Sequence, residues 1–358
     1  MFSAQQHNKR RISRIIATVV KILLPLAISA ALIRWLLHNV NIHRMENIIH
    51  DGVDYRYICI MMALTALSLI IRGFRWRLQL NAAGVNGVSG IGGCIAIFGA
   101  YALNLVFPFL GEAWRCVFIA RKADVKLSTV VGTDIGDRAS DGIMIVLFIA
   151  ATIFIAHNAM VRFMDYYSVG RILHELISDT TVWYIIGITL LASGIMLYIF
   201  RSSHFVQGMK HSALRIWNGF AVLFHLKKTG LYLLLTVGIW ACYFFETYVC
   251  FYAFPFTREL ITQPGSCYGM IPGLVVFVFG SCSILIPSNG GLGTWNIAVM
   301  FALGLYNIGD TDGAAYSMVC WSMQTLTYAA LGIFSACYIT FTRRKSKKQL
   351  KLPKQSVK

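Results

Sequence analysis

Long runs of apolar residues, separated by short polar stretches, make up most of the chain. Several of these runs reach the roughly 20 residues that a helix needs to cross a bilayer. No polar stretch is long enough for a separate soluble domain, so we expect residues 1–358 to form a single, all-α, polytopic membrane domain. The pattern predicts six full membrane spans: Ile15 to Leu37, Tyr57 to Trp76, Val130 to His157, Val182 to Phe200, Leu231 to Phe254 and Ala314 to Phe341.

Two further apolar runs are interrupted by helix-breaking residues. In residues 90–120, Pro108 and Gly111 break the first run, and in residues 270–305 the turn Pro287-Ser-Asn-Gly-Gly-Leu-Gly-Thr294, with Gly290, Gly291 and Gly293, breaks the second. Broken helices at membrane depth are tolerated only where protein or a water-filled cavity satisfies the freed backbone groups. We therefore expect a re-entrant hairpin at each run.

The basic residues predict the orientation of these segments, because Lys and Arg are concentrated in cytoplasmic loops. They cluster in five places, namely Lys9 to Lys21, Arg72 to Arg77, Arg115 to Arg138, Arg201 to Lys228 and Arg343 to Lys358. Both flanks of the first interrupted run are basic, so that hairpin should enter from the cytoplasm and return. Both flanks of the second are neutral or acidic, so it should enter from the outside. The expected fold is an inverted pseudo-repeat; a model with eight full crossings remains open.

The terminal and central basic segments should lie on the cytoplasmic side. Residues 1–14 form a basic cytoplasmic tail, and residues 343–358 read as a disordered basic tail near anionic headgroups or as a topology signal alone. In residues 202–228 the apolar side chains fall on one helical face, which predicts an amphipathic helix at the interface or a linker helix packed on the bundle. That face is formed by Phe205, Met209, Ala213, Ile216, Trp217, Phe220 and Phe224.

Composition excludes several classes of protein. Hydrophobic residues make up 57% of the chain and charged residues 13%, and the mean hydropathy is +0.64, so a soluble globular protein is excluded. The net charge of +17 is better explained by orientation and anionic lipid than by nucleic acid. Nine cysteines are scattered without a Cys-x-x-Cys pair, and neither a phosphate-binding loop nor a convincing metal spacing occurs. We expect no cofactor and no metal.

Charged residues within or beside the apolar runs are the candidate site residues. Glu112 and Arg115 are spaced for an ion pair across one helical turn, or Arg115 binds a lipid phosphate that Glu112 holds or releases. Arg138 can reach Asp134 and Asp141 on its own helix. These residues either neutralise one another as structural ion pairs, or they form a gate. The gate would exchange partners with Arg115 or with substrate.

Two more acidic residues, Asp137 and Glu246, are candidates for opening and closing the site or for coupling transport to an ion gradient. Asp137 belongs to the same charged group as Arg138. Glu246 lies inside an apolar span, where a charged residue is costly unless it is protonated, paired or in a cavity. It either couples transport to an ion or forms a structural hydrogen bond.

Four motifs in order resemble the flippase-like family named for the transmembrane region of lysylphosphatidylglycerol synthase. They are Arg72-Gly-Phe-Arg-Trp-Arg77, Asn104 with Pro108-Phe-Leu-Gly-Glu-Ala-Trp-Arg115, Asp137-Arg-Ala-Ser-Asp141 and Pro287-Ser-Asn-Gly-Gly-Leu-Gly293. Many members of the family carry a Glu where this chain has Asn296, so no role is transferred to that position. The sequence shows no soluble aminoacyl-transferring domain, so the resemblance implies movement of lipid rather than transfer of lysine.

We therefore expect a lipid transporter or flippase in the cell membrane that moves an anionic lipid by alternating access. Its headgroup would meet Arg115, Arg138, Glu112 and Asn104, and the hairpin tips would meet near the membrane midplane. One alternative is a lipid-modifying enzyme with Glu112 and the Asp cluster as acid and base. Another is a scaffold for a separately encoded envelope transferase. Expected partners are membrane lipids, with a homo-oligomer or such an envelope enzyme also considered, and no nucleic acid.

Overall fold

A computed structural model describes residues 25–38, 40–166, 228–283 and 288–351, together with residues 191, 214, 217, 221, 226 and 286. Side chains at 51, 165, 166 and 343–351 are not part of that description. The predicted N-terminal tail, the span Val182 to Phe200, most of the amphipathic helix 202–228 and the turn residue Pro287 lie outside the described residues.

The described part of the chain is helical and contains no strand. After an apolar helix at Pro25–His38, its α-helices are α2 (Ile42–Asp51), α3 (Tyr55–Ala82), α4 (Gly90–Val106), α5 (Leu110–Ala123), α6 (Leu127–Ile155), α7 (His157–Tyr166), α11 (Thr229–Cys250), α12 (Pro255–Thr262), α13 (Met270–Cys282), α14 (Thr294–Gly304) and α15 (Asp310–Lys351). A 3₁₀ turn, η3, covers Asn289–Gly291.

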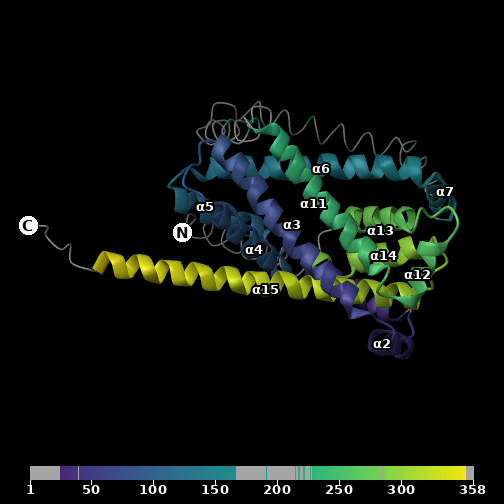
Figure 1. The fold of residues 1–358 in the computed structure, drawn as a ribbon. Coiled ribbons are helices and arrows are strands. Elements are labelled where there is room, and N and C mark those ends of the chain that lie inside the picture. The colour runs from purple at the N-terminus through teal and green to yellow at the C-terminus, as the bar shows by residue number, and fades with distance from the viewer. Residues whose placement is uncertain are drawn as a thin grey trace, which may run out of the picture.

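Four of these helices are long and apolar enough to cross a membrane. They are α3, α6, α11 and the Asp310–Thr342 part of α15, and each corresponds to a predicted span. Figure 1 shows α6 and α15 running along the length of the molecule, with α3 and α11 lying obliquely between them. Length, composition and this arrangement define a multi-pass helical membrane protein.

Helices α3 and α11 pack against each other in antiparallel directions. Near the end of α3, the Gln79 side chain donates a hydrogen bond of 2.8 Å to the hydroxyl of Tyr232 at the start of α11. Near the start of α3, the ring of Tyr57 stacks on that of Tyr252, which follows α11, with centroids 5.4 Å apart. The two helices therefore form the central pair of the described fold (Figure 1).

Helices α4 and α5 form a hairpin, as predicted from Pro108. Helix α4 ends at Val106, and Phe109 adopts a left-handed conformation with φ of 64° before α5 begins. A Cβ on Gly99 would lie 2.5 Å from the ring of Trp114, and one on Gly92 would lie 3.0 Å from the Lys122 ammonium. Residues early in α4 thus face residues late in α5, so both ends of the hairpin lie at the same end of the molecule.

Gly111 is not part of the turn, although it was predicted there. It lies in the first turn of α5, where a Cβ would overlap the carbonyl oxygen of Ala100 in α4. Glycine at this position permits the close approach of the two helices.

Helices α13 and α14 form the second hairpin. The predicted turn glycines Gly290, Gly291 and Gly293 all have left-handed φ values, of 57°, 80° and 84°. Trp295 at the start of α14 lies against Gly280 near the end of α13, where a Cβ would be 2.7 Å from the indole nitrogen. Glycine is favoured at the positive φ values of Gly290, Gly291 and Gly293, because it adopts them without the strain that a side chain adds.

The tips of the two hairpins are in contact. The Asn289 amide in η3 donates a hydrogen bond of 3.4 Å to the Val106 carbonyl at the end of α4. A Cβ on Gly290 would lie 3.6 Å from the Cα of Leu105. In Figure 1 the α4–α5 hairpin occupies one half of the molecule and the α13–α14 hairpin the other. The hairpins therefore point toward each other from opposite ends.

Two sequence-based expectations are wrong in detail. The predicted second span ends at Trp76, but α3 continues to Ala82, so Arg77 also lies inside the helix and the basic cluster Arg72 to Arg77 is not in a loop. The predicted disordered C-terminal tail begins at residue 343, but α15 continues as a helix from the apolar stretch as far as Lys351. In both places the helix continues past the long apolar run, through a stretch where charged and apolar residues are mixed.

Candidate functional site

A buried network of charges joins α3 to α6. Arg75 donates hydrogen bonds of 3.0 and 2.6 Å to one Asp137 oxygen and of 2.8 Å to Asp141. Arg72 donates to the other oxygens of Asp137 and Asp141, at 3.2 and 2.7 Å. Arg75 and Asp137 are fully buried, with 0% of each exposed. Charge-assisted pairs of this kind are strong, and each aspartate here accepts from both arginines.

Arg115 extends this network from the first hairpin. Its guanidinium forms an ion pair with Asp134 and lies 3.6 Å from an Asp137 oxygen. It also lies over the Trp76 ring, 4.7 Å from the centroid, while the Trp76 indole donates to Thr133 at 3.2 Å. Only 1% of Arg115 is exposed. Arg115 therefore connects α5 to α3 and α6 from the interior.

Glu112 and Arg138 form a second ion pair at the edge of the network. The Arg138 side chain is 40% exposed and that of Glu112 18% exposed. Asn104 of α4 donates to the same Glu112 oxygen at 3.1 Å and accepts the Gly111 backbone N–H at 2.8 Å. Asn104 thus satisfies a backbone N–H in the first turn of α5 and positions the Glu112 carboxylate. Because Glu112 is the partner of Arg138, the start of α5 determines where the Arg138 guanidinium lies.

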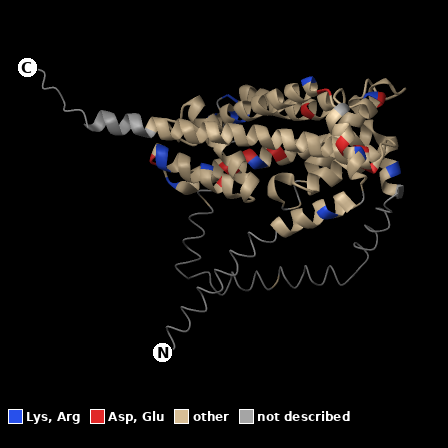
Figure 2. Ribbon diagram, turned by 90° about the horizontal axis from the view of Figure 1, so that it is seen from below, with Lys and Arg blue, Asp and Glu red and all other residues tan. Residues whose placement is uncertain are grey.

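These eight side chains are balanced in charge. Four arginines (72, 75, 115 and 138) face four carboxylates (112, 134, 137 and 141), so the group is neutral when all are ionised. Figure 2 shows blue and red positions lying close together within a ribbon that is mostly tan.

Arg138 lies about 16 Å along α6 from Leu127, at about 1.5 Å per residue, well inside the span. An accessible arginine at that depth requires a partner or a cavity.

The pairings differ from those predicted. Glu112 does not pair with Arg115, and Arg138 does not pair with Asp134 or Asp141 on its own helix. Glu112 pairs with Arg138, while Arg115 pairs with Asp134. The predicted pairs are local to one helix, whereas the observed ones cross from α5 to α6 because the hairpin packs against that span. Among the predicted headgroup residues, Arg138 is exposed and Arg115 is buried.

Tyrosine hydroxyls lie between the charge network and Glu246. Arg72 donates to the Tyr243 hydroxyl at 3.3 Å, and the hydroxyls of Tyr243 and Tyr101 are 3.4 Å apart. The rings of Tyr101 and Tyr328 are in contact, with centroids 5.1 Å apart. Glu246 on α11 is buried and accepts a hydrogen bond of 3.1 Å from Gln324 on α15. No ion pair involves Glu246 among the described residues.

The tip of the second hairpin is fixed by two other helices and by a cap within the hairpin itself. The Trp321 indole on α15 donates to the Gly290 carbonyl at 2.8 Å, and the Asn289 backbone N–H donates to Ser29 at 3.3 Å. Asn296 accepts the Gly293 backbone N–H at 3.0 Å and is fully buried, so it caps α14. This capping role explains why a polar but uncharged residue is buried at position 296.

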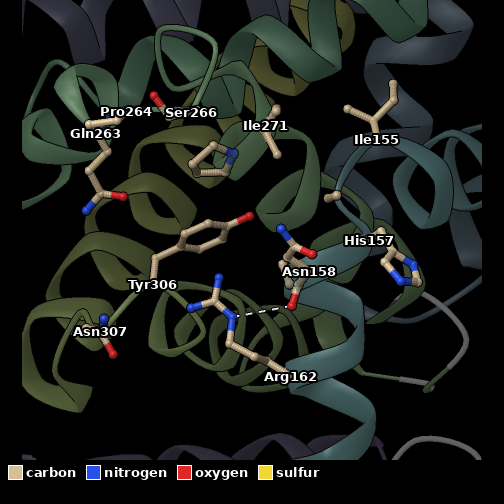
Figure 3. Close-up of a pocket in the computed structure, with 14 residues that line it drawn as sticks. Ile155, His157, Asn158, Arg162, Gln263, Pro264, Ser266, Ile271, Tyr306 and Asn307 are labelled. Atoms are coloured by element: carbon tan, nitrogen blue, oxygen red, sulfur yellow. Dashed lines mark hydrogen bonds between the residues drawn. The ribbon is translucent and has the colours of Figure 1, made fainter.

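A cavity of about 320 Å³, lined by both polar and apolar residues, lies at the end of the molecule opposite the base of the first hairpin. Arg162 of α7 reaches over the Tyr306 ring, 6.0 Å from its centroid, and donates to the Asn158 carbonyl at 3.3 Å (Figure 3). The buried Tyr306 hydroxyl points into this cavity without a hydrogen-bond partner in the described structure. Sequence reasoning gave no indication of this cavity, because its residues come from three separate loops and helix ends.

Arg72 and Arg75 are the main site residues that sequence reasoning missed. They were interpreted only as cytoplasmic charges that orient a span, although both belong to a motif that contributes Trp76 as well. Their spacing of three residues places them on one helical face, which is the signal that could have identified them.

Comparison with protein families supports the same class of protein. The family model described as the lysylphosphatidylglycerol synthase transmembrane region matches residues 22–332. The chain belongs to this family of membrane proteins with lipid-related functions. Among the curated proteins and the solved structures compared with it, none matches.

Proposed function

We propose that this protein moves an anionic lipid between the leaflets of the cell membrane by alternating access. The observation that carries the proposal is the arrangement of two broken-helix hairpins, which point toward each other from opposite ends and touch at their tips. Transporters commonly place binding sites at such discontinuous helices. Parting of the tips would open a path beside the Glu112–Arg138 pair.

Arg138 is the residue proposed to meet the lipid phosphate. Its guanidinium is partly exposed and its present partner, Glu112, is attached to the hairpin tip. An incoming phosphate would replace the Glu112 carboxylate with a bidentate partner of the same charge. Movement of the first hairpin would then couple the release of Arg138 from Glu112 to the arrival of the lipid.

The buried part of the network would act as the gate. Asp137 and Asp141 each contact both Arg72 and Arg75, and Asp137 also lies near Arg115. Such a group can exchange partners without leaving a charge unpaired, because several acceptors and donors are within reach of each other. Arg115, attached to the moving hairpin, is the member that would exchange.

The direct test is leaflet-resolved transport in proteoliposomes, with a fluorescent phosphatidylglycerol and a polyprenyl phosphate compared in separate samples. Wild-type protein should translocate one of them faster than protein-free vesicles. Headgroup turnover by purified protein would favour the lipid-modifying enzyme instead, and activity only with an added envelope transferase would favour the scaffold.

Arg138→Gln should reduce that translocation by roughly tenfold or more, since a charge-assisted contact is worth about 1.5–3 kcal/mol. Arg138→Lys should keep part of the rate, because an ammonium preserves charge but not the guanidinium fork. Arg56→Gln, which removes an exposed cation in a pair with Asp54, is the matched control. A normal rate in Arg138→Gln would exclude Arg138 from headgroup binding.

Glu246 is proposed to couple transport to a proton gradient. It is a buried carboxyl group on α11 that accepts a hydrogen bond from the Gln324 amide and forms no ion pair among the described residues. Glu246→Gln preserves shape and hydrogen bonding, so the variant should fold normally and lose the gradient dependence of transport. The measurement is the transport rate with and without an imposed pH gradient. An unchanged dependence would leave Glu246 with a structural role only.

The proposed setting is a cell membrane with both termini on the cytoplasmic side. The base of the first hairpin carries Arg121, Lys122 and Lys126. By the charge rule this end faces the cytoplasm.

A further inference from the structure

A cleft of about 370 Å³ lies between α5 and the C-terminal part of α15. Helix α5 contributes Trp114, Val117, Phe118, Arg121 and Lys122, a spacing that forms one continuous helical face. Helix α15 contributes Tyr338 on the opposite wall. In this region α15 contacts α4, through the Ser335 hydroxyl and the Ile95 carbonyl at 2.8 Å, which leaves the face of α5 open.

The chemistry of the cleft changes along its length. Toward the hairpin tip it is apolar and aromatic, with the rings of Trp114 and Phe118 stacked at 5.1 Å. Toward the base it ends in two cations, and the Lys122 ammonium lies 5.9 Å from the centroid of the Phe118 ring. An apolar slot that ends in positive charge at a membrane interface matches the structure of an anionic lipid.

The positive charge at the base of the cleft has no acidic partner among the described residues. Within the described chain neither Arg121 nor Lys122 forms an ion pair, and no carboxylate lines the cleft. The Lys122 ammonium lies beside the first turn of α4, 3.0 Å from the position of a Cβ on Gly92, and that turn contains no acidic residue. A helix N-terminus carries partial positive charge. The two cations and this helix end therefore form a basic site that no carboxylate of the described residues neutralises.

We propose that the cleft holds an anionic phospholipid, with its phosphate against Arg121 and Lys122 and an acyl chain along Phe118, Val117 and Trp114. This site is separate from the Glu112–Arg138 pair, which lies near the hairpin tip. The bound lipid fills the space between α5 and α15 and supports the first hairpin from its outer side. The proposal does not depend on whether the protein transports lipid.

Native mass spectrometry of the purified chain tests this site, with phosphatidylglycerol and phosphatidylcholine of identical acyl chains as the two probes. Wild-type protein should retain phosphatidylglycerol over phosphatidylcholine. Arg121→Gln with Lys122→Gln should weaken its retention by roughly tenfold to thirtyfold, from about 1 kcal/mol per basic residue. Lys126→Gln with Lys228→Gln removes the same charge from two exposed positions that do not line the cleft, and should retain the lipid as wild-type does.

A second variant separates occupation of the cleft from surface charge. Val117→Trp keeps both cations but fills the apolar slot, and it should lose phosphatidylglycerol as well. Equal retention by the Arg121/Lys122 variant and wild-type would overturn the proposal. So would retention by Val117→Trp, because the lipid would then lie on the basic surface and not in the cleft.

Discussion

Replacing Asp137 with Asn should destabilise the protein more than any other single change in the charge network. Asp137 is fully buried and accepts hydrogen bonds from both Arg72 and Arg75, with Arg115 at 3.6 Å. Asparagine removes the negative charge and turns an amide donor toward guanidinium donors. Breaking a buried ion pair costs about 3–5 kcal/mol, so most of the variant should be unfolded or aggregated when extracted in detergent.

Thermal unfolding in detergent measures this effect. Asp124→Asn is the matched control, since Asp124 is exposed, caps α5 in a left-handed conformation and can be replaced by Asn there. Its stability should change by no more than about 0.5 kcal/mol. Adding Arg75→Gln to Asp137→Asn restores charge balance and should recover part of the lost stability. Wild-type stability in the single variant would show that the network is not buried as described.

Gly111→Ala should prevent the first hairpin from closing. The added Cβ would overlap the Ala100 carbonyl oxygen and would lie 2.7 Å from Asn104 Oδ1, so backbone must move in response. Overpacking of this kind costs about 1–3 kcal/mol. It would also displace Asn104 from the Gly111 N–H and from Glu112, so transport should fall to the protein-free background.

Gly142→Ala is the control for Gly111→Ala. Gly142 is also in a helix, but a Cβ there would meet nothing within 4 Å. Alanine favours helix over glycine by about 1 kcal/mol, so this variant should be as stable as wild-type or more stable. Transport and unfolding temperature should be measured on both variants. Normal transport by Gly111→Ala would show that close contact between α4 and α5 is not needed for function.

The sequence was sufficient to predict the broken helices, because their signals are local. Pro108 cannot continue a helix, and the glycines around Gly290 adopt the left-handed φ values that other residues avoid. The family resemblance was equally accessible, since its motifs are contiguous, and the match to residues 22–332 confirms it.

The pairing of charges could not be predicted because it depends on how helices pack. Glu112 and Arg115 have the spacing of an ion pair within one helix. In the structure each pairs instead with a residue on α6, Arg138 and Asp134 respectively, because the hairpin packs against that helix. Arg72 and Arg75 lie near the end of the predicted span Tyr57 to Trp76, and the sequence indicated only that they orient it. Inside the protein Asp137 and Asp141 neutralise them, and those partners lie on another helix.

The central claim is that the hairpin tips must part for lipid to pass, and a reversible cross-link tests it most directly. Leu105→Cys with Gly290→Cys, in a background without native cysteines, places two thiols where the tips touch. Oxidation should lower the rate of leaflet-to-leaflet transport in proteoliposomes to the protein-free level, and reduction should restore it. Single-cysteine variants should be unaffected by either treatment. If protein shown by mass to be fully cross-linked transports lipid as fast as reduced protein, the tips do not form the gate.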